Sequence, residues 1–174
     1  MAQKLRVPLG FIVAALVIYF AEPTGISILI GLPVALIGLL FRALAAGVIK
    51  KDSTLATAGV YGITRNPLYL GSALLASGFA IMSANDYATT LLLVPFVLIY
   101  PTVILREEAH LKRLFPEEFR VYQGKVPRFL PRLGRIDRPS FSFDQYLANR
   151  EYNTAFGFVA ALAIFIFKWW LVRD

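Results

Sequence analysis

Long apolar blocks, separated by short polar stretches, dominate the chain. Five blocks are candidate membrane-spanning helices, at residues 7–21, 26–49, 67–84, 88–105 and 153–171. A helix needs about 20 apolar residues to cross the hydrocarbon core. The first and third blocks are shorter, so they require bilayer thinning or packing against neighbours. The pattern predicts an all-α integral membrane protein with about five transmembrane helices, forming a single domain over residues 1–174.

The largest polar stretch is segment 106–138, which we predict to be a cytosolic segment of mixed helical and extended structure. Its first part, "REEAHLKRLF", has a helical pattern that breaks at Pro116 and resumes as "EEFRVYQ" until Gly124. The following "VPRFLPRLGR" is rich in proline and arginine and is predicted to be extended. Segment 139–152 mixes aromatic and polar residues, which indicates a position along the membrane interface.

Composition and charge support the membrane assignment and give an orientation. The 174 residues are 57% hydrophobic and 17% charged, with a net charge of +7. Nine lysine or arginine residues lie between Arg106 and Arg138. Positive charge next to spans is typical of a cytoplasmic membrane surface rather than of nucleic-acid binding. We therefore expect a protein integral to the cytoplasmic membrane, with the N-terminus inside, the C-terminus outside and any active site on the cytosolic face.

Two residue types limit the possible chemistry. The chain has no cysteine, which excludes disulfides and thiolate sites. His110 is the only histidine, and we expect no metal site because transition-metal sites usually need several His or Cys ligands. Neither a G-x-G-x-x-G motif after a strand nor a P-loop occurs, so a Rossmann domain or nucleotide triphosphatase has no support. No credible pair of a nucleophile and a histidine is present either.

The stretch "TRNPLY", residues 64–69, places polar groups at the start of the third apolar block. Pro67 suits the first helical position, with Asn66 as the N-cap. The free N–H groups and the positive dipole end there favour an anion, and Arg65 adds a full charge. Tyr69, one turn into the helix, can direct its hydroxyl at a bound group. The alternative is an ordinary capped helix whose Arg and Tyr anchor it at the interface.

Glu107 and Glu108 form the second candidate feature. A helical projection of this segment shows an apolar stripe defined by Leu111, Leu114 and Phe115. Glu107 falls inside this stripe, where a carboxylate is costly unless it meets a cation. Glu108 falls at its edge, where we expect a surface pair with Lys112. Glu107 is thus predicted to bind a positive group of a ligand; the alternative is a salt bridge to Arg65 or Arg42.

Three other polar residues have two open interpretations each. Arg42 lies within the second apolar block and either extends to the inner interface or faces the same pocket as Glu107. Tyr122 and Arg128 either line that pocket or cover the interface. The sequence does not decide between these interpretations.

Two blocks together resemble the isoprenylcysteine carboxyl methyltransferase family, its bacterial members especially. They are "FRALAAGVIKKDSTLATAGVYGITRNPLYLG" and "REEAHLKRLFPEEFRVYQGKVPRFLP", separated by a helical hairpin. The related phospholipid N-methyltransferases share this layout. The resemblance implies an integral-membrane methyltransferase that uses S-adenosylmethionine without a Rossmann domain. Its acceptor would be a membrane lipid or a lipidated small molecule that arrives laterally from the bilayer.

The resemblance also implies roles for particular residues. The family's cofactor-binding (His/Asn)-Pro-x-Tyr motif falls on Asn66, Pro67, Leu68 and Tyr69, its upstream tyrosine on Tyr61, and a further cofactor contact on Ser53, Thr54, Leu55 and Ala56. The first glutamate of the family's Glu-Glu pair is Glu107. In chemical terms, Arg65 and the helix N-terminus suit the carboxylate of S-adenosylmethionine, and Glu107 suits its ammonium group.

The family's pattern differs from this chain at the acceptor site. Known eukaryotic members hold the substrate carboxylate with an arginine at the position of Val103. We therefore expect an acceptor other than a prenylcysteine carboxylate, with Arg42, Val103 and Tyr122 as candidate substrate-binding residues. Tyr69, Glu107 and Arg106 are the candidate catalytic residues. A non-catalytic scaffold with the same fold, a prenylcysteine methyltransferase proper and an NADPH-dependent membrane reductase remain alternatives, and the sequence does not indicate the oligomeric state.

Overall fold

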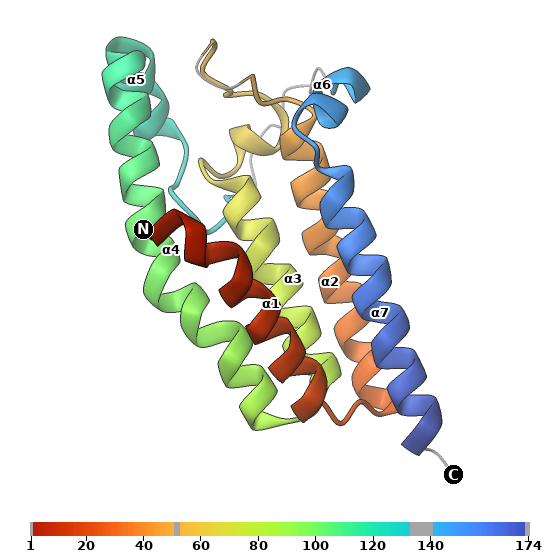
Figure 1. Ribbon diagram of the computed structural model, residues 1–174. Coiled ribbons are helices and arrows are strands. Elements are labelled where there is room, and N and C mark those ends of the chain that lie inside the picture. Colours follow the sequence, from red (N-terminus) through yellow and green to blue (C-terminus); the bar gives the residue numbers. More distant parts are fainter. Residues whose placement is uncertain (1, 51–52, 133–140, 173–174) are drawn as a thin grey trace.

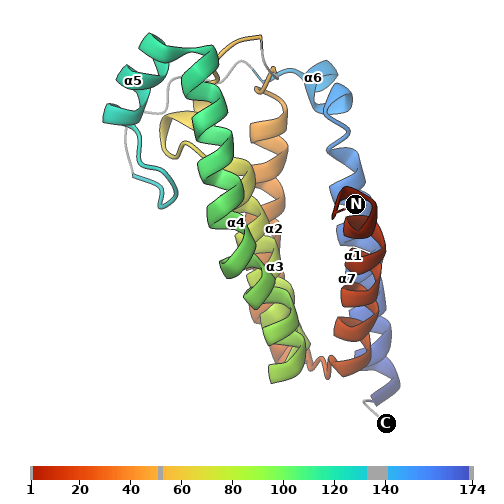
Figure 2. The same cartoon turned by 60° about the vertical axis from the view of Figure 1, so that its left-hand side comes forward.

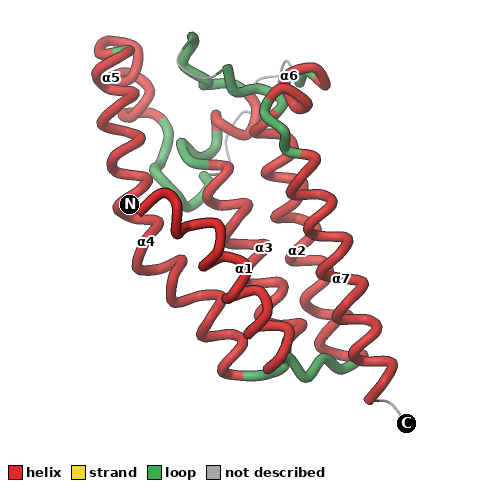
Figure 3. The backbone as a smooth tube through the Cα atoms, viewed as in Figure 1, coloured by secondary structure: helices red, strands yellow, loops and turns green. Residues whose placement is uncertain are grey.

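The computed structural model describes residues 2–50, 53–132 and 141–172, and every regular element in these residues is a helix (Figure 3). The elements in chain order are α1 (Ala2–Phe20), α2 (Gly25–Ala46), the 3-10 helix η1 (Gly59–Gly62), α3 (Pro67–Ser83), α4 (Asp86–Leu114), α5 (Pro116–Lys125), α6 (Phe143–Ala148) and α7 (Tyr152–Val172). The predicted all-α class is confirmed. Residues 133–140, which include the end of the expected cytosolic segment and the start of the expected interfacial one, lie outside the described residues.

Three of the described helices, α2, α4 and α7, are long and apolar enough to cross a membrane, and α3 is a shorter apolar helix. Helix α4 has 29 residues and is therefore roughly 43 Å long at 1.5 Å per residue. This exceeds the hydrocarbon thickness of about 30 Å. The predicted fourth span and the "REEAHLKRL" segment are thus one continuous helix, whose last turns extend beyond the other helices together with α5 (Figure 1).

The helices form a bundle with short connections at one end and long ones at the other. Helices α2 and α3 run side by side, α7 lies along α2, and α4 packs against both α3 and α1 (Figures 1 and 2). At the short end the amide of Glu22 donates to the carbonyl of Ser83, 2.7 Å away, which joins the two short turns. The long connections, which include the loop from Gly47 to Asn66, gather at the opposite end. The polar candidate residues belong to that end.

Helices α2 and α3 approach so closely that their contact requires glycine. A Cβ atom on Gly38 would lie 2.6 Å from the carbonyl oxygen of Gly71, and one on Gly31 would lie 2.5 Å from that of Gly78. A Cβ on Gly71 would lie 2.6 Å from the Cγ of Arg42. Small residues of this kind allow helix backbones to touch and gain dispersion energy where apolar lipid supplies no hydrophobic drive. The contact thereby fixes the position of Arg42 along α3.

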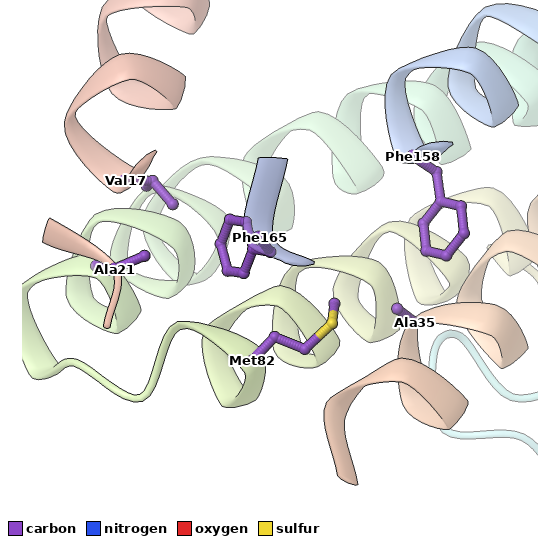
Figure 4. Packing of buried hydrophobic residues seen from close by; sticks show 7 residues of the cluster. Val17, Ala21, Ala35, Met82, Phe158 and Phe165 are labelled. Carbon is purple, nitrogen blue, oxygen red and sulfur yellow. The ribbon is translucent and has the colours of Figure 1, made fainter. Parts of the chain in front are cut away.

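The apolar core lies toward the short-turn end and draws on five helices, α1, α2, α3, α4 and α7, and on the turn after α1. Its buried members include Val17 of α1, Ala21 of the following turn, Ala35 of α2, Met82 of α3, and Phe158 and Phe165 of α7 (Figure 4). At the same end the ammonium of Lys168 donates to the carbonyls of Ile18 and Tyr19, 2.7 and 2.8 Å away. A cation at the carboxyl end of a helix satisfies its last carbonyl groups, so Lys168 attaches α7 to α1.

We predict that Gly78→Ala destabilises the protein by about 1–3 kcal/mol, because an added methyl group overpacks a close contact. Its Cβ would lie 2.6 Å from both the Cβ and the amide nitrogen of Ala35. The matched control is Gly157→Ala in α7, where a Cβ would meet nothing within 4 Å. Thermal unfolding in detergent should show a lower midpoint for Gly78→Ala and an equal or higher one for the control. Equal midpoints would contradict the packing argument.

Candidate active site

A segment without regular secondary structure, residues 126–132, holds the start of α3. The amide of Arg65 donates to the carbonyl of Pro127 at 2.9 Å, and that of Arg132 to the carbonyl of Ile63 at 3.0 Å. Between them, the fully buried hydroxyl of Thr64 donates to the carbonyl of Phe129 at 2.9 Å. Because buried backbone groups need partners, these bonds fix the turn that leads into α3. The segment was predicted to be extended; residues 126–132 contain no helix but bend at 126 and at 128–130.

Glu108 is the carboxylate at the centre of this region, and its side chain is only 9% exposed. It accepts hydrogen bonds from Asn66 Nδ2 at 3.1 Å and from Arg128 Nε at 3.0 Å. Arg65 Nε lies 3.4 Å from the same carboxylate, within ion-pair distance. A buried carboxylate needs such cations and donors to offset its lost hydration. Glu108 therefore joins α4 to the start of α3 and to the 126–132 segment.

The expected roles of the two glutamates were wrong in one respect. Glu108 is not a surface residue paired with Lys112; it is the buried member of the pair, and Glu107 is half-buried. The predicted stripe was misplaced because Leu114 is 43% exposed and Phe115 lies beyond the end of α4. The buried face of α4 instead follows Ile104 and Glu108, four residues apart.

Asn66 occupies the N-cap position of α3, as predicted, but its side chain does not cap the helix. Its amide nitrogen donates to Glu108 and to the carbonyl of Arg128, 2.9 Å away. The first N–H groups of α3 therefore take no side-chain acceptor from the N-cap residue. The Nε of Arg65 is buried and also has no hydrogen-bond partner among the described residues. Both features leave donors for an anion at the start of α3.

Glu107 pairs with Tyr69 on the other side of this helix start. The Tyr69 hydroxyl donates to Glu107 Oε2 at 2.5 Å. The ring of Tyr69 meets Tyr100 edge to face at 5.5 Å, and Tyr100 stacks on Phe96 with centroids 3.9 Å apart. Aromatic faces carry negative charge density that attracts cations. The carboxylate and these rings together provide an environment suited to a positively charged group.

These groups line a cavity of about 530 Å³, which falls within the range of about 300–1,000 Å³ for small-molecule sites. Helices α2, α3, α4 and α5, η1 and the 49–56 loop all contribute to its wall. The lining residues are Arg42, Ile49, Lys50, Thr54, Leu55, Ala56, Tyr61, Arg65, Asn66, Leu68, Tyr69, Ser72, Tyr100, Glu107, Glu108, His110, Leu111, Phe119 and Tyr122.

Two buried tyrosines on this wall remain protonated. Burial is the main cause that raises the pKa of Tyr61 above its usual range, and the nearby Glu107 carboxylate raises it further. Burial likewise raises the pKa of Tyr122, and Arg65 partly opposes this. The Tyr122 hydroxyl donates to the carbonyl of Tyr61 at 2.7 Å. Neither phenol is therefore suited to act as a base near neutral pH.

The structure brings most of the predicted site residues together. Those that line the cavity are Thr54, Leu55, Ala56, Tyr61, Arg65, Asn66, Leu68, Tyr69, Glu107, Arg42 and Tyr122. Ser53, Pro67, Val103 and Arg106 are not among the lining residues, and the Arg106 side chain is exposed. The structure therefore does not place these four residues in contact with the cavity.

Arg42, a candidate substrate-binding residue, lines the cavity but is already paired. Its Nε and Nη2 donate to the two carboxylate oxygens of Glu151 at 2.7 and 2.9 Å. Its Nη1 donates to the hydroxyl of Ser72 at 2.5 Å. Glu151 was not predicted as a site residue, although its position in the sequence indicates that it needs a partner. An isolated carboxylate at the start of an apolar block is costly without a cation, and Arg42 is the cation it meets.

The sequence profile of the phospholipid methyltransferase family matches residues 27–118, which is more than half of the chain. This chain belongs to the phospholipid methyltransferase family. The matched region runs from α2 into the first turn of α5. It contains both glutamates of α4 and the start of α3, whereas the 126–132 segment and Glu151 lie outside it. No solved structure shows a significant match.

Individual relatives agree with this assignment. The chain is 33% identical over 127 residues to the cobalt-zinc-cadmium resistance protein CzcN of Cupriavidus metallidurans, an alignment that covers 73% of the chain and 57% of that protein. It is 35% identical, over 73% of the chain and 58% of the relative, to the nickel-cobalt-cadmium resistance protein NccN of Alcaligenes xylosoxydans. The protein-S-isoprenylcysteine O-methyltransferase of Schizosaccharomyces pombe is 31% identical, over 52% of the chain and 39% of the enzyme. The chain thus spans less than two thirds of each relative, and the predicted family resemblance is confirmed.

We predict that Glu108→Gln destabilises the fold by about 3–5 kcal/mol, because it leaves the buried Arg65 without its counter-charge. The matched control is Glu117→Gln, which removes an exposed pair with Arg120 whose side chains are 80% and 73% exposed. Exposed pairs contribute about 0–1 kcal/mol. Chemical or thermal unfolding in detergent should separate the two variants. A Glu108→Gln protein as stable as the control would contradict the network.

Proposed function

We propose that this protein is a membrane-embedded, S-adenosylmethionine-dependent methyltransferase that acts on a lipid or lipidated acceptor at the cytosolic membrane face. Family membership supports this reaction class, because the matching profile is that of phospholipid methyltransferases. The observation that carries the proposal is the cavity, whose wall holds the Glu107 carboxylate and the Arg65 guanidinium. The buried Nε of Arg65 has no hydrogen-bond partner among the described residues, although it lies within ion-pair distance of Glu108. S-adenosylmethionine presents an ammonium, a carboxylate and a sulfonium, so its charges match this wall.

The residues of the cavity fit the cofactor on two structural grounds. The Arg65 Nε is buried without a hydrogen-bond partner among the described residues, and the α3 N-terminus takes no cap from Asn66. These groups would hold the cofactor carboxylate. Glu107 and Tyr69, which are hydrogen-bonded to each other, would hold the ammonium. When bound, the cofactor supplies an electrophilic methyl group on its sulfonium.

The chain's own contribution to the reaction is orientation, exclusion of water and transfer of one proton. A methyl displacement needs the acceptor lone pair aligned with the methyl carbon, which a closed cavity wall provides. Tyr61 and Tyr122 stay protonated and act as donors or as wall. Glu107 is the carboxylate suited to accept a proton from an amine acceptor, with Tyr69 holding it in place. An acceptor carboxylate would need no base.

The charges of the cavity support an acceptor other than a prenylcysteine carboxylate. Arg42 is paired with Glu151, and the carboxylate of the cofactor would occupy Arg65. Val103, at the position where relatives carry a substrate-holding arginine, supplies no charge. An acceptor carboxylate would therefore compete with carboxylates already in place, at the cost of an incompletely paired buried charge.

A second candidate function is a non-catalytic membrane component. The names of two relatives favour it, because CzcN and NccN are described as metal-resistance proteins. No group of three or more His, Cys, Asp or Glu side chains suited to a metal occurs among the described residues. A non-catalytic protein would not need to bind a cofactor in this cavity. A single binding measurement therefore distinguishes the two candidate functions.

We predict that the purified protein binds S-adenosylhomocysteine and that Glu107→Gln weakens this binding by about 10–100-fold, since charge-assisted hydrogen bonds contribute about 1.5–3 kcal/mol. The matched control is Glu118→Gln, an exposed position on α5. Isothermal titration calorimetry measures all three proteins. Absence of binding to the wild type would favour the non-catalytic alternative, and equal affinities in folded variants would exclude Glu107 from the site.

We also predict five membrane spans, with the long-connection end of the bundle in the cytosol. The positive charge between Arg106 and Arg138 motivates this orientation. Reporter fusions after Ser83, Lys125 and Val172 should read outside, inside and outside, because these residues end α3, α5 and α7. An inside reading after Val172 would remove α7 from the set of spans.

A further inference from the structure

The junction between α6 and α7 reaches α2 with two side chains. Asn149 Nδ2 donates to the carbonyls of Ala46 and Ile49, at 2.8 and 3.0 Å, and so satisfies the carboxyl end of α2. Two residues later, Glu151 forms its two-pronged pair with Arg42. Asn149 and Glu151 lie outside the region that the family profile matches, whereas their partners near α2 lie inside it. We define residues 149–151 as the α6–α7 junction.

The backbone of this junction is held in an uncommon conformation. Arg150 lies in the left-handed region with φ of 54°, a conformation that costs a non-glycine residue free energy. The amide of Arg150 donates to the carbonyl of Leu147 at 2.9 Å, and that of Glu151 to the carbonyl of Tyr146 at 3.3 Å. This is the helix-ending arrangement in which glycine usually occupies the left-handed position. It turns the chain sharply, so that Asn149 and Glu151 both contact α2.

Arg42 transmits the position of this junction to the cavity. Besides Glu151, it contacts the hydroxyl of Ser72 and the carbonyl of Leu68, which belongs to the first turn of α3. Arg42, Leu68 and Ser72 line the cavity, whereas Glu151 does not. The Glu151 side chain is 8% exposed. Glu151 is therefore a buried anion whose influence on the cavity passes through Arg42.

We propose that the α6–α7 junction is a positioning element of the cavity, with Glu151 as its positioning residue. Glu151 fixes the Arg42 guanidinium against the first turn of α3 and neutralises its charge. Arg42 thereby forms part of the cavity wall and is not a receptor for an anionic headgroup. The expected effect of Glu151 on cofactor binding rests on the proposed function. Its role in fixing the position of Arg42 does not.

The geometry of the pair favours this role over that of an anion receptor. Arg42 uses Nε, Nη1 and Nη2 for partners on α3 and α7, and Thr154 Oγ1 accepts a further bond from Nη2 at 3.3 Å. A guanidinium that donates two parallel bonds to one carboxylate is already satisfied in its preferred geometry. An incoming phosphate would have to displace a buried carboxylate, which would then lack a counter-charge.

The test uses a single cysteine at Leu68, which is possible because the chain has no native cysteine. The rate at which a methanethiosulfonate reagent labels Leu68→Cys reports how firmly this wall is held, without any cofactor. The rate is compared in three further backgrounds: Glu151→Gln, Arg42→Lys and Lys168→Met. The last is the matched control, because Lys168 attaches the opposite end of α7 to α1. Affinity for S-adenosylhomocysteine is measured in the same variants without the added cysteine.

We expect Glu151→Gln and Arg42→Lys to raise the labelling rate on the order of tenfold, since each opens a local contact. Cofactor-analogue affinity should fall by a similar factor, because small displacements of a binding wall are costly. Lys168→Met should lower the unfolding midpoint and change neither quantity. Arg42→Lys keeps the charge but loses the two-pronged geometry, so its agreement with Glu151→Gln would support positioning.

Two results would overturn the proposal. One is a labelling rate in Glu151→Gln that equals the rate in Lys168→Met. The other is protection of the Leu68→Cys thiol by inorganic phosphate in the Glu151→Gln background, which would show that Arg42 is an anion receptor released by the mutation. If the wild type does not bind S-adenosylhomocysteine, the proposed function fails, and the labelling rates alone still decide the role of Glu151.

Discussion

The close contact between α2 and α3 is the constraint on which the rest of the structure depends. It exists because glycines face each other across the two helices, so that Gly38 meets the backbone of Gly71 directly. In lipid, where apolar side chains gain little from association, such backbone contact holds helices together. The contact determines where Arg42 of α2 lies along α3. It also places one end of each helix beside the cavity. A bulkier residue at these positions would separate the walls of that cavity.

Polar groups complete what this packing begins. Both arginines of the cavity wall have a carboxylate that reaches them from a distant part of the chain: Glu108 for Arg65 and Glu151 for Arg42. These pairs are costly to desolvate, so they contribute more to the arrangement of the wall than to net stability. They leave Glu107, paired with a neutral tyrosine hydroxyl, as the carboxylate suited to a cationic ligand. Glu107 and Glu108 differ in role because Glu108 lies on the buried face of α4 and Glu107 does not.

Much of the fold followed from local signals, and much of the site did not. Helices α2, α3 and α7 lie close to the predicted apolar blocks, because helix length and hydropathy are properties of contiguous sequence. Helix α1 begins before its block, and α4 continues past residue 105 to Leu114. The start of α3 at Pro67 was likewise readable from its cap residues. The predicted burial of Glu107 and Glu108 was interchanged, because the stripe used to place them included residues at the helix end. Glu151 lies 109 residues from Arg42, and only the packed bundle reveals that pairing.

The central claim is that the cavity serves methyl transfer to a membrane lipid. The most direct test feeds methyl-labelled methionine to cells with and without the protein and compares their lipids by mass spectrometry. The same cells carrying the Glu107→Gln variant provide the control for activity. A labelled lipid that appears with the wild-type protein and is absent or reduced with Glu107→Gln is the predicted result. Identical labelled lipids in all three strains would contradict the account.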